Sequence, residues 1–206
     1  MQQRNPYEPP GAQLDQQASA PTASGAELQY ATFWQRFGAY WIDVLVLAPL
    51  AVVVYFLAET SRYFYMYWYV LGLLIGLFFH VYLVKRYGGT PGKLLLKTRI
   101  ALVDGSPITT NAAALRYAVL FVLTAISSGA LSMGVLSMTD EMYFSLGYVA
   151  RAQKMMELAP SWYPLVNVLV QIWIWGEFIS MLFNKKRRAV HDFMAGTVVV
   201  RSQAHA

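Results

Sequence analysis

Two things are scarce in this sequence: cysteine and charge. The chain of 206 residues contains no cysteine, which excludes disulfides, thiolate zinc sites and cysteine nucleophiles. Only 13% of its residues are charged, whereas a soluble domain usually has about 25% charged residues. Hydrophobic residues make up 57% of the chain, so most of it is not built to face water. The composition predicts a membrane protein.

The first segment, residues 1–28, differs from the rest. It is rich in Gln, Ala, Pro and Ser and has almost no large apolar side chains. Such a segment cannot bury enough surface to offset the entropy cost of ordering its backbone. We expect it to be disordered.

Four long apolar segments follow, at about 33–58, 64–84, 112–136 and 163–183. A helix needs about 20 residues to cross the hydrocarbon core of a bilayer, and each segment reaches or exceeds that length. Lone strands are excluded, because they would leave backbone groups unpaired in lipid. The sequence therefore predicts an all-α membrane protein whose four-helix transmembrane bundle contacts the lipid bilayer.

The basic residues predict the orientation of these spans. Except for Arg62, Arg151 and Lys154, every Lys and Arg lies before or early in the first span, in or just after the loop 85–111, or after the fourth span. Lys and Arg are enriched in cytoplasmic loops of membrane proteins. We expect both termini and this inner loop to be cytoplasmic. The formal charge of +5 is then explained by the basic residues on the cytoplasmic side, and we do not expect nucleic-acid binding.

The inner loop has a strand-like part. Residues 98–103 and 106–109 flank an Asp-Gly pair and are expected to form a hairpin, while the tail 197–201 is also strand-like. We expect the tail to pair with the hairpin, giving a small cytoplasmic β element formed by the inner loop and the C-terminal tail.

The outer loop has apolar residues at helical spacing between charged residues, over about 140–158. This pattern is typical of an amphipathic helix that lies on the membrane surface or caps the bundle.

Charged residues inside the spans are the candidates for function. Arg36 and Asp43 are seven residues apart in the first span, which places them on one helix face about 10 Å apart along the axis. Glu177 in the fourth span and His80 in the second fall at a similar depth. We therefore expect one polar cluster in the cytoplasmic half, in which Asp43 and Glu177, with His80, bind a proton or cation.

A structural alternative applies to each of these residues. Arg36 and Asp43 can serve only to orient the helix end and hold the bundle together. Glu177 can be satisfied by Asn184 or by the basic run that follows it. His80 can be a hydrogen-bonded interfacial residue rather than a proton carrier. The sequence leaves both interpretations open.

Two motifs resemble enzyme sites but lack essential parts. The stretch GGTPGK at 88–93 lacks the first glycine of a P-loop and the Ser or Thr that follows its lysine. We interpret Gly89, Thr90, Pro91, Gly92 and Lys93 as an inner-loop turn and helix start. The pair His191-Asp192 has no third ligand or nucleophile at a suitable spacing. We therefore expect no enzyme activity, cofactor or metal.

The order of these motifs resembles one family. An Arg opens the first span, an Asp lies inside it, GGTPGK and an Asp-Gly pair follow, and RRAVHDFMAGTVVV comes after the last span. This order resembles the RDD family of integral membrane proteins, named for one arginine and two aspartates, over about Phe33 to Arg201. In this resemblance the named residues correspond to Arg36, Asp43 and Asp192, the last of which follows His191.

One position departs from the family pattern. Family members often carry a glycine soon after TPGK, where this chain has Lys97. The resemblance otherwise implies an RDD-type membrane domain over 29–203 in a bacterial inner membrane. It also implies a role in transport, since some members are proposed to be cation/proton antiporters.

Two functions follow as hypotheses. The first is a small cation/proton transporter with an intramembrane carboxylate site, expected to be a homo-oligomer because four spans are few for a transport path. The second is a non-transporting accessory protein that anchors a cytoplasmic platform for a protein partner. Asp192 has a structural interpretation of its own, as a latch that pairs with Arg36, Lys93 or the basic run.

Overall fold

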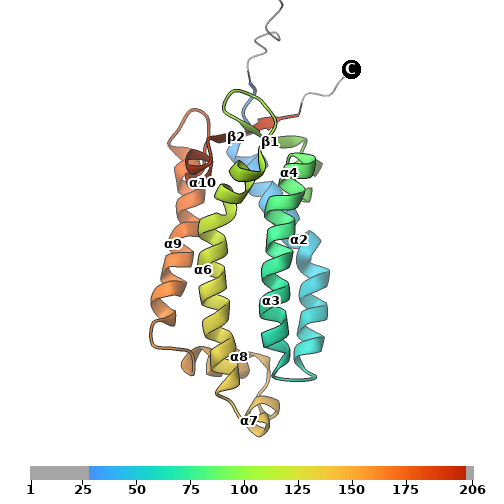
Figure 1. The fold of residues 1–206 in the computed structure, drawn as a ribbon, viewed down its shortest axis with the longest axis vertical. Helices are drawn as coiled ribbons and strands as arrows, with labels where there is room; N and C mark the ends of the chain where they lie inside the picture. Colours follow the sequence, from blue (N-terminus) through green and yellow to red (C-terminus); the bar gives the residue numbers. More distant parts are fainter. Residues whose placement is uncertain (1–27, 203–206) are drawn as a thin grey trace, which may run out of the picture.

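Four long helical segments run side by side in the computed structural model, which describes residues 28–202 (Figure 1). They are α2 (Phe33–Ala58); α3 (Phe64–Leu77), continued by η1 (Phe78–Tyr82) and α4 (Leu83–Tyr87); α6 (Thr110–Leu136); and α9 (Tyr163–Leu182). All four are long and apolar enough to cross a membrane, which confirms the four predicted spans. The segment expected to be disordered lies, apart from Leu28, outside the described residues.

The second span is longer and less regular than predicted. It continues to Tyr87 and ends at Gly88, whose φ of 81° is in the left-handed region. Between α3 and α4 the chain makes a π-helical turn, η1, with His80 at its centre. Single π-turns inside α-helices occur frequently at functional sites.

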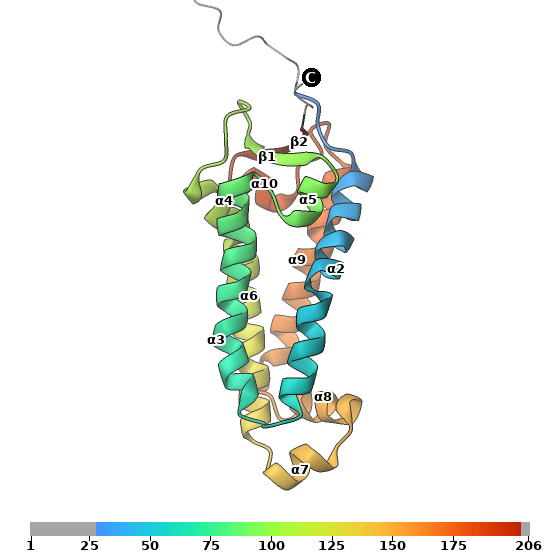
Figure 2. The ribbon, with the colours of Figure 1, turned by 90° about the vertical axis from the view of Figure 1, so that its right-hand side faces the viewer.

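One end of the bundle carries a small sheet, and we call it the sheet end (Figure 2). It contains α5 (Pro91–Leu95), β1 (Thr98–Leu102), α10 (Val190–Met194) and β2 (Thr197–Arg201). The two strands pair antiparallel, with Ile100 opposite Val199. These two side chains pack with Val84 and Ala113 in a buried cluster that joins the sheet to the second and third spans.

The sheet confirms one prediction and corrects another. The tail does pair with the inner loop. The hairpin expected around the Asp-Gly pair was wrong, because residues after the turn make only one isolated bridge, Ala101 to Pro107. It is the tail that pairs with β1 along its whole length, with Leu102 opposite Thr197 and Thr98 opposite Arg201.

The other end of the bundle is closed by α7 (Asp140–Ser145) and α8 (Tyr148–Glu157). The single helix expected over 140–158 was wrong, because Leu146 adopts an extended backbone with ψ of 132° and interrupts it. Arg151 binds Glu59 with two hydrogen bonds of 3.0 Å. The fully buried Tyr143 donates to the carbonyl oxygen of Ala58 at 2.7 Å. These contacts fasten the two short helices to the end of the first span.

Lys97, the position that departs from the family pattern, has a φ of 51°. This left-handed conformation is costly for residues with a Cβ and suits glycine. The backbone geometry therefore matches a position at which glycine would be favoured.

Candidate functional site

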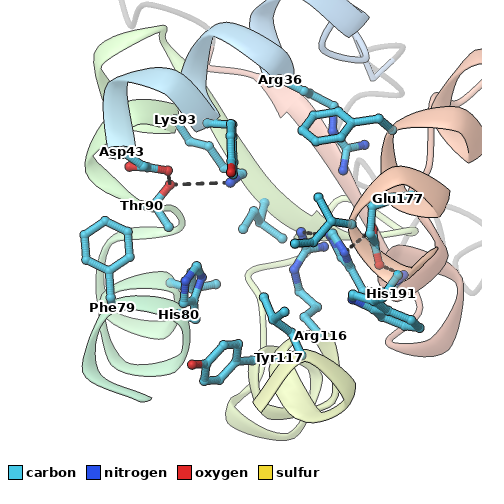
Figure 3. Close-up of a pocket in the computed structure, with 18 of the residues that line it drawn as sticks. Arg36, Asp43, Phe79, His80, Thr90, Lys93, Arg116, Tyr117, Glu177 and His191 are labelled. Carbon is cyan, nitrogen blue, oxygen red and sulfur yellow. Dashed lines mark hydrogen bonds and ion pairs between the residues drawn. The ribbon is translucent and has the colours of Figure 1, made fainter. Parts of the chain in front are cut away.

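A cavity of about 280 Å³ lies inside the bundle near the sheet end. Its apolar walls include Val44, Leu47, Phe79, Leu120 and Ile174. Polar residues from six elements and from the turn before α5 line it, and Figure 3 labels nine of them: Arg36, Asp43, His80, Thr90, Lys93, Arg116, Tyr117, Glu177 and His191. Asp43, Glu177 and His80 of the predicted cluster thus line one cavity together with Arg36, although these four do not bind one another.

Asp43 binds the start of α5 rather than Arg36. Its Oδ2 accepts a hydrogen bond of 2.6 Å from the Thr90 hydroxyl, and its Oδ1 accepts one of 2.7 Å from the backbone N–H of Gly92. The side chain of Asp43 therefore caps α5, because the first N–H groups of a helix have no partner within the helix. Arg36 and Asp43 share a helix face but do not pair, since Arg36 binds Asp192 beside the C-terminal tail.

The contact between Asp43 and α5 explains the residue types of the motif TPGK. Thr90 supplies the hydroxyl for Asp43, and Pro91 occupies the first turn of α5, where a missing N–H costs nothing. A Cβ on Gly92 would collide with the carbonyl oxygen of Ala39 in α2, so only glycine permits this approach. The ammonium of Lys93 lies beside the cavity and donates to the Thr90 hydroxyl at 3.4 Å (Figure 3).

Asp192 is at the centre of a second group of contacts, which we call the tail latch: Arg36, Arg116, Asp192 and Thr197. Arg36 donates to Asp192 Oδ2 at 2.5 Å, while Arg116 pairs with Oδ1. Thr197 donates to Oδ1 at 3.0 Å, and the backbone N–H of Ala189 donates to Oδ2 at 2.9 Å. The latch thus joins the first span, the third span and β2 through one carboxylate.

The tail latch holds the Asp192 carboxylate in its charged form. The side chain of Asp192 is completely buried, and those of Arg36 and Arg116 are 5% and 7% exposed. Burial alone would raise the pKa of Asp192, but the charges of Arg116 and Arg36 outweigh it and hold the pKa well below its usual value. The Asp192 carboxylate is therefore fixed in its charged form by partners from three parts of the chain.

Glu177 and His191 form a third group beside the latch. Glu177 Oε1 accepts from the backbone N–H of His191 at 3.2 Å, and the imidazole Nδ1 lies against Oε2. Arg116 Nη2 lies 2.8 Å from His191 Nε2. Because arginine can only donate, Nε2 must accept, and the proton of the neutral ring is on Nδ1, facing Glu177. Burial and then the Arg116 charge lower the pKa of His191, which favours this neutral form.

His80 takes no part in these contacts. Its ring stacks on Tyr117 of α6, with centroids 4.6 Å apart and planes 21° apart. Within residues 28–202 no hydrogen bond of its side chain is present, although it faces the cavity (Figure 3). Nor do the described residues bring three His, Asp or Glu side chains together in a way that could hold a metal ion.

A family model described as "RDD family" matches residues 30–196. The chain belongs to the RDD family. A search of curated proteins found no match. The structure divides the three residues that the resemblance matched to the family name between two contacts: Asp43 with α5, and Arg36 with Asp192.

Sequence reasoning did not assign the role of Arg116. This residue lies in the second turn of α6, where a basic residue could be interpreted only as part of the flanking charge. One signal was available. An arginine buried in a span requires an acidic partner, and few acidic residues lie on the same side of the membrane. Thr90 was assigned to the turn, but its bond to Asp43 was not anticipated, because 47 residues separate the two.

Proposed function

We propose that this RDD protein exchanges a small cation for a proton through the cavity near the sheet end. The observation that carries the proposal is the environment of Asp43. Both of its hydrogen bonds come from neutral donors, and the side-chain cation that approaches it, Lys93, reaches it through the Thr90 hydroxyl. Its charge is therefore compensated through the Thr90 hydroxyl rather than by a direct ion pair.

Such an arrangement suits exchange for an electrostatic reason. A cation that binds at Asp43 would place a second positive charge beside the Lys93 ammonium, and in a low dielectric these charges repel strongly. Loss of one proton from Lys93 removes the repulsion. One cation then enters as one proton leaves, so the net charge of the cavity stays constant, which limits the cost of an uncompensated charge within the membrane.

The Glu177–His191 pair supplies the second side of the proposed site. Glu177 belongs to α9, and the cavity separates it from Asp43 in α2 (Figure 3). A proton released inside the cavity would pass to the Glu177 carboxylate, because the acceptor nitrogen of His191 is already bound to Arg116. Tyr40 and Val44 of α2, which also line the cavity, are 44% and 40% exposed, so its wall reaches the surface of the bundle.

The proposed orientation places the sheet end in the cytoplasm of a bacterial inner membrane. Its support is the distribution of basic residues: Lys85, Arg86, Arg99 and the run 185–188 all belong to the sheet end, as does the cavity. The cation site would then open toward the cytoplasmic half of the membrane.

The test is ion exchange by the purified full chain in liposomes that contain a pH-sensitive dye. Gradients of Na⁺, K⁺ or Li⁺ are imposed on wild type, Asp43→Asn and Lys93→Gln. We expect wild type to move protons in response to one of these cations. Asp43→Asn should abolish the signal, and Lys93→Gln should let the cation move without the proton.

The control is Lys154→Gln, which removes an amine of the same kind at the α7–α8 end, where Lys154 pairs with Glu157. It should exchange like wild type. A folded wild-type protein that moves no proton under any of the three gradients would contradict the proposal.

A second function has support from a different observation. The tail latch and the sheet hold the inner loop and the C-terminal tail against the bundle as one unit, which would suit a platform for a cytoplasmic protein partner. Mild crosslinking in native membranes followed by purification should then recover one partner in stoichiometric amount. Recovery of the protein alone would argue against this alternative.

A further inference from the structure

Two amides lie in the first half of the fourth span, away from the sheet end. Asn167 and Gln171 are the only carboxamide side chains more than three residues inside any of the four spans. They are four residues apart, so they lie on the same side of α9. Gln171 is exposed and Asn167 half-buried. Within residues 28–202 neither side chain has a hydrogen-bond partner.

The same side of α9 forms an open groove. Its lining consists of Asn167, Val168, Gln171, Ile172, Trp175, Gly176 and Ile179. A Cβ on Gly176 would meet no atom within 4 Å, so nothing in the described chain fills the groove there. The helix lies at the edge of the bundle (Figure 1). The cavity of the proposed exchange site is lined by other residues of α9, among them Ile174 and Glu177.

Lipid alone is a poor occupant of this groove. Acyl chains offer no hydrogen-bond partner, and an amide carries two donors and an acceptor that all lose water in the hydrocarbon core. Amide side chains at such positions pair across neighbouring transmembrane helices, and small residues let the backbones approach. Gln171 and Asn167 supply the polar groups, and Gly176 supplies the small residue.

A second copy of the chain meets these requirements without any further component. A carboxamide both donates and accepts, so the same amide on a copy related by a twofold axis along the membrane normal is a complementary partner at the same depth. Val168, Ile172 and Ile179 flank the amides and would pack against their counterparts. A different membrane protein would have to present its own polar group at this depth.

We propose that two copies of this protein associate through the α9 face formed by Asn167, Gln171, Ile172, Trp175 and Gly176, with the amides hydrogen-bonded across the twofold axis. This dimer does not depend on the proposed ion exchange, because each cavity remains within its own four spans. It assigns a surface to the oligomer that the sequence suggested only in general terms.

The absence of cysteine allows a direct test, because any introduced cysteine is the only thiol in the chain. Ile172→Cys is placed on the proposed face. Leu74→Cys in α3 and Val122→Cys in α6 are matched controls, since these residues are also exposed, at 57% and 52%, and lie near the middle of their spans. The full-length proteins are reconstituted in phosphatidylcholine vesicles at low protein-to-lipid ratio and oxidised with copper phenanthroline.

The proposal expects a disulfide-linked dimer for Ile172→Cys and little for the two controls, because a disulfide requires Cβ atoms about 4 Å apart. Adding Gln171→Leu should weaken the dimer about 3- to 10-fold, the effect of losing one interhelical hydrogen bond in a bilayer. Leucine suits lipid, so this variant should fold, and an unchanged melting temperature would verify that.

Three results would overturn the proposal. One is absence of a dimer for Ile172→Cys. Another is equal crosslinking at all three positions, which would indicate random collision. The last is a dimer whose yield is unaffected by Gln171→Leu. If Ile172→Cys crosslinks only to a different protein in native membranes, the groove belongs to that partner rather than to a second copy.

Discussion

Asp43 and Asp192, the two aspartates matched to the RDD signature by resemblance, are both buried, yet their charges are balanced in different ways. Asp192 is held by two guanidinium groups, a hydroxyl and a backbone N–H. Asp43 is held by one hydroxyl and one backbone N–H, with the Lys93 ammonium at the far side of the hydroxyl. The first arrangement leaves no freedom to exchange a partner, whereas the second keeps a carboxylate beside a cavity. The comparison separates a structural aspartate from a candidate ion-binding one within a single signature.

The largest expected effect comes from breaking the tail latch. Asp192→Asn would leave Arg36 and Arg116 buried without a counter-charge, which typically costs about 3–5 kcal/mol of stability. Unfolding in mixed micelles by SDS titration would measure it. Asp140→Asn is the control, because Asp140 also pairs with an arginine but is 66% exposed, and such pairs contribute about 1 kcal/mol or less. Equal losses for the two variants would contradict a buried latch.

The contact between α2 and α5 should be nearly as sensitive. Gly92→Ala places a methyl group against the Ala39 carbonyl and beside Asp43, so we expect a loss of about 1–3 kcal/mol. Proton exchange in liposomes should fall with it, since Asp43 would lose its fixed position. Gly72→Ala is the matched control: its added Cβ would meet only Trp68 of the same helix, at 3.7 Å. If Gly92→Ala left the stability unchanged, the close approach of α5 to α2 would be contradicted.

A pH titration separates the two regions. The folded protein lowers the pKa of His191 below its ordinary value near 6.5, so the unfolded state binds the proton more readily. Stability should therefore be full above about pH 6.5 and should fall by up to about 1 kcal/mol between pH 6.5 and 5.5. Melting temperatures at the two pH values would measure the change.

His191→Gln is the control for that titration. It removes the titrating group, and the decrease in stability between pH 6.5 and 5.5 should become smaller. The Asp192 carboxylate does not contribute in this range, because its low pKa keeps it charged well below pH 5. A decrease of the same size in the variant would assign the pH dependence to other groups.

The smallest expected effect concerns the turn after α5. Lys97→Gly removes the strain of a left-handed residue and should raise stability by about 1 kcal/mol. Lys97→Ala deletes the same charge but keeps the Cβ, so it should give no gain. A gain from both substitutions would mean that the charge, and not the backbone conformation, is the destabilising feature.

Much of the architecture could be predicted from the sequence, because bilayer thickness imposes helix length directly on the hydrophobic pattern. The spans 33–58 and 163–183 end within one residue of α2 and α9. The pairing of the tail with the inner loop followed from β-branched residues near the turn motif. The break within 140–158 was missed because helical spacing of apolar residues continues across Leu146. The available signal was Gly147, which follows Leu146 and is the N-cap of α8.

The sequence by itself determined that Arg36 and Asp43 share one helix face, that four spans form, and that polar groups gather at one depth. Only the tertiary structure decided which groups meet. Arg36 binds Asp192, which is 156 residues away, rather than Asp43 at seven. The physical reason is that two helical turns keep side chains about 10 Å apart, whereas packing of the tail brings Asp192 to the guanidinium and packing of α5 brings Thr90 and Gly92 to Asp43.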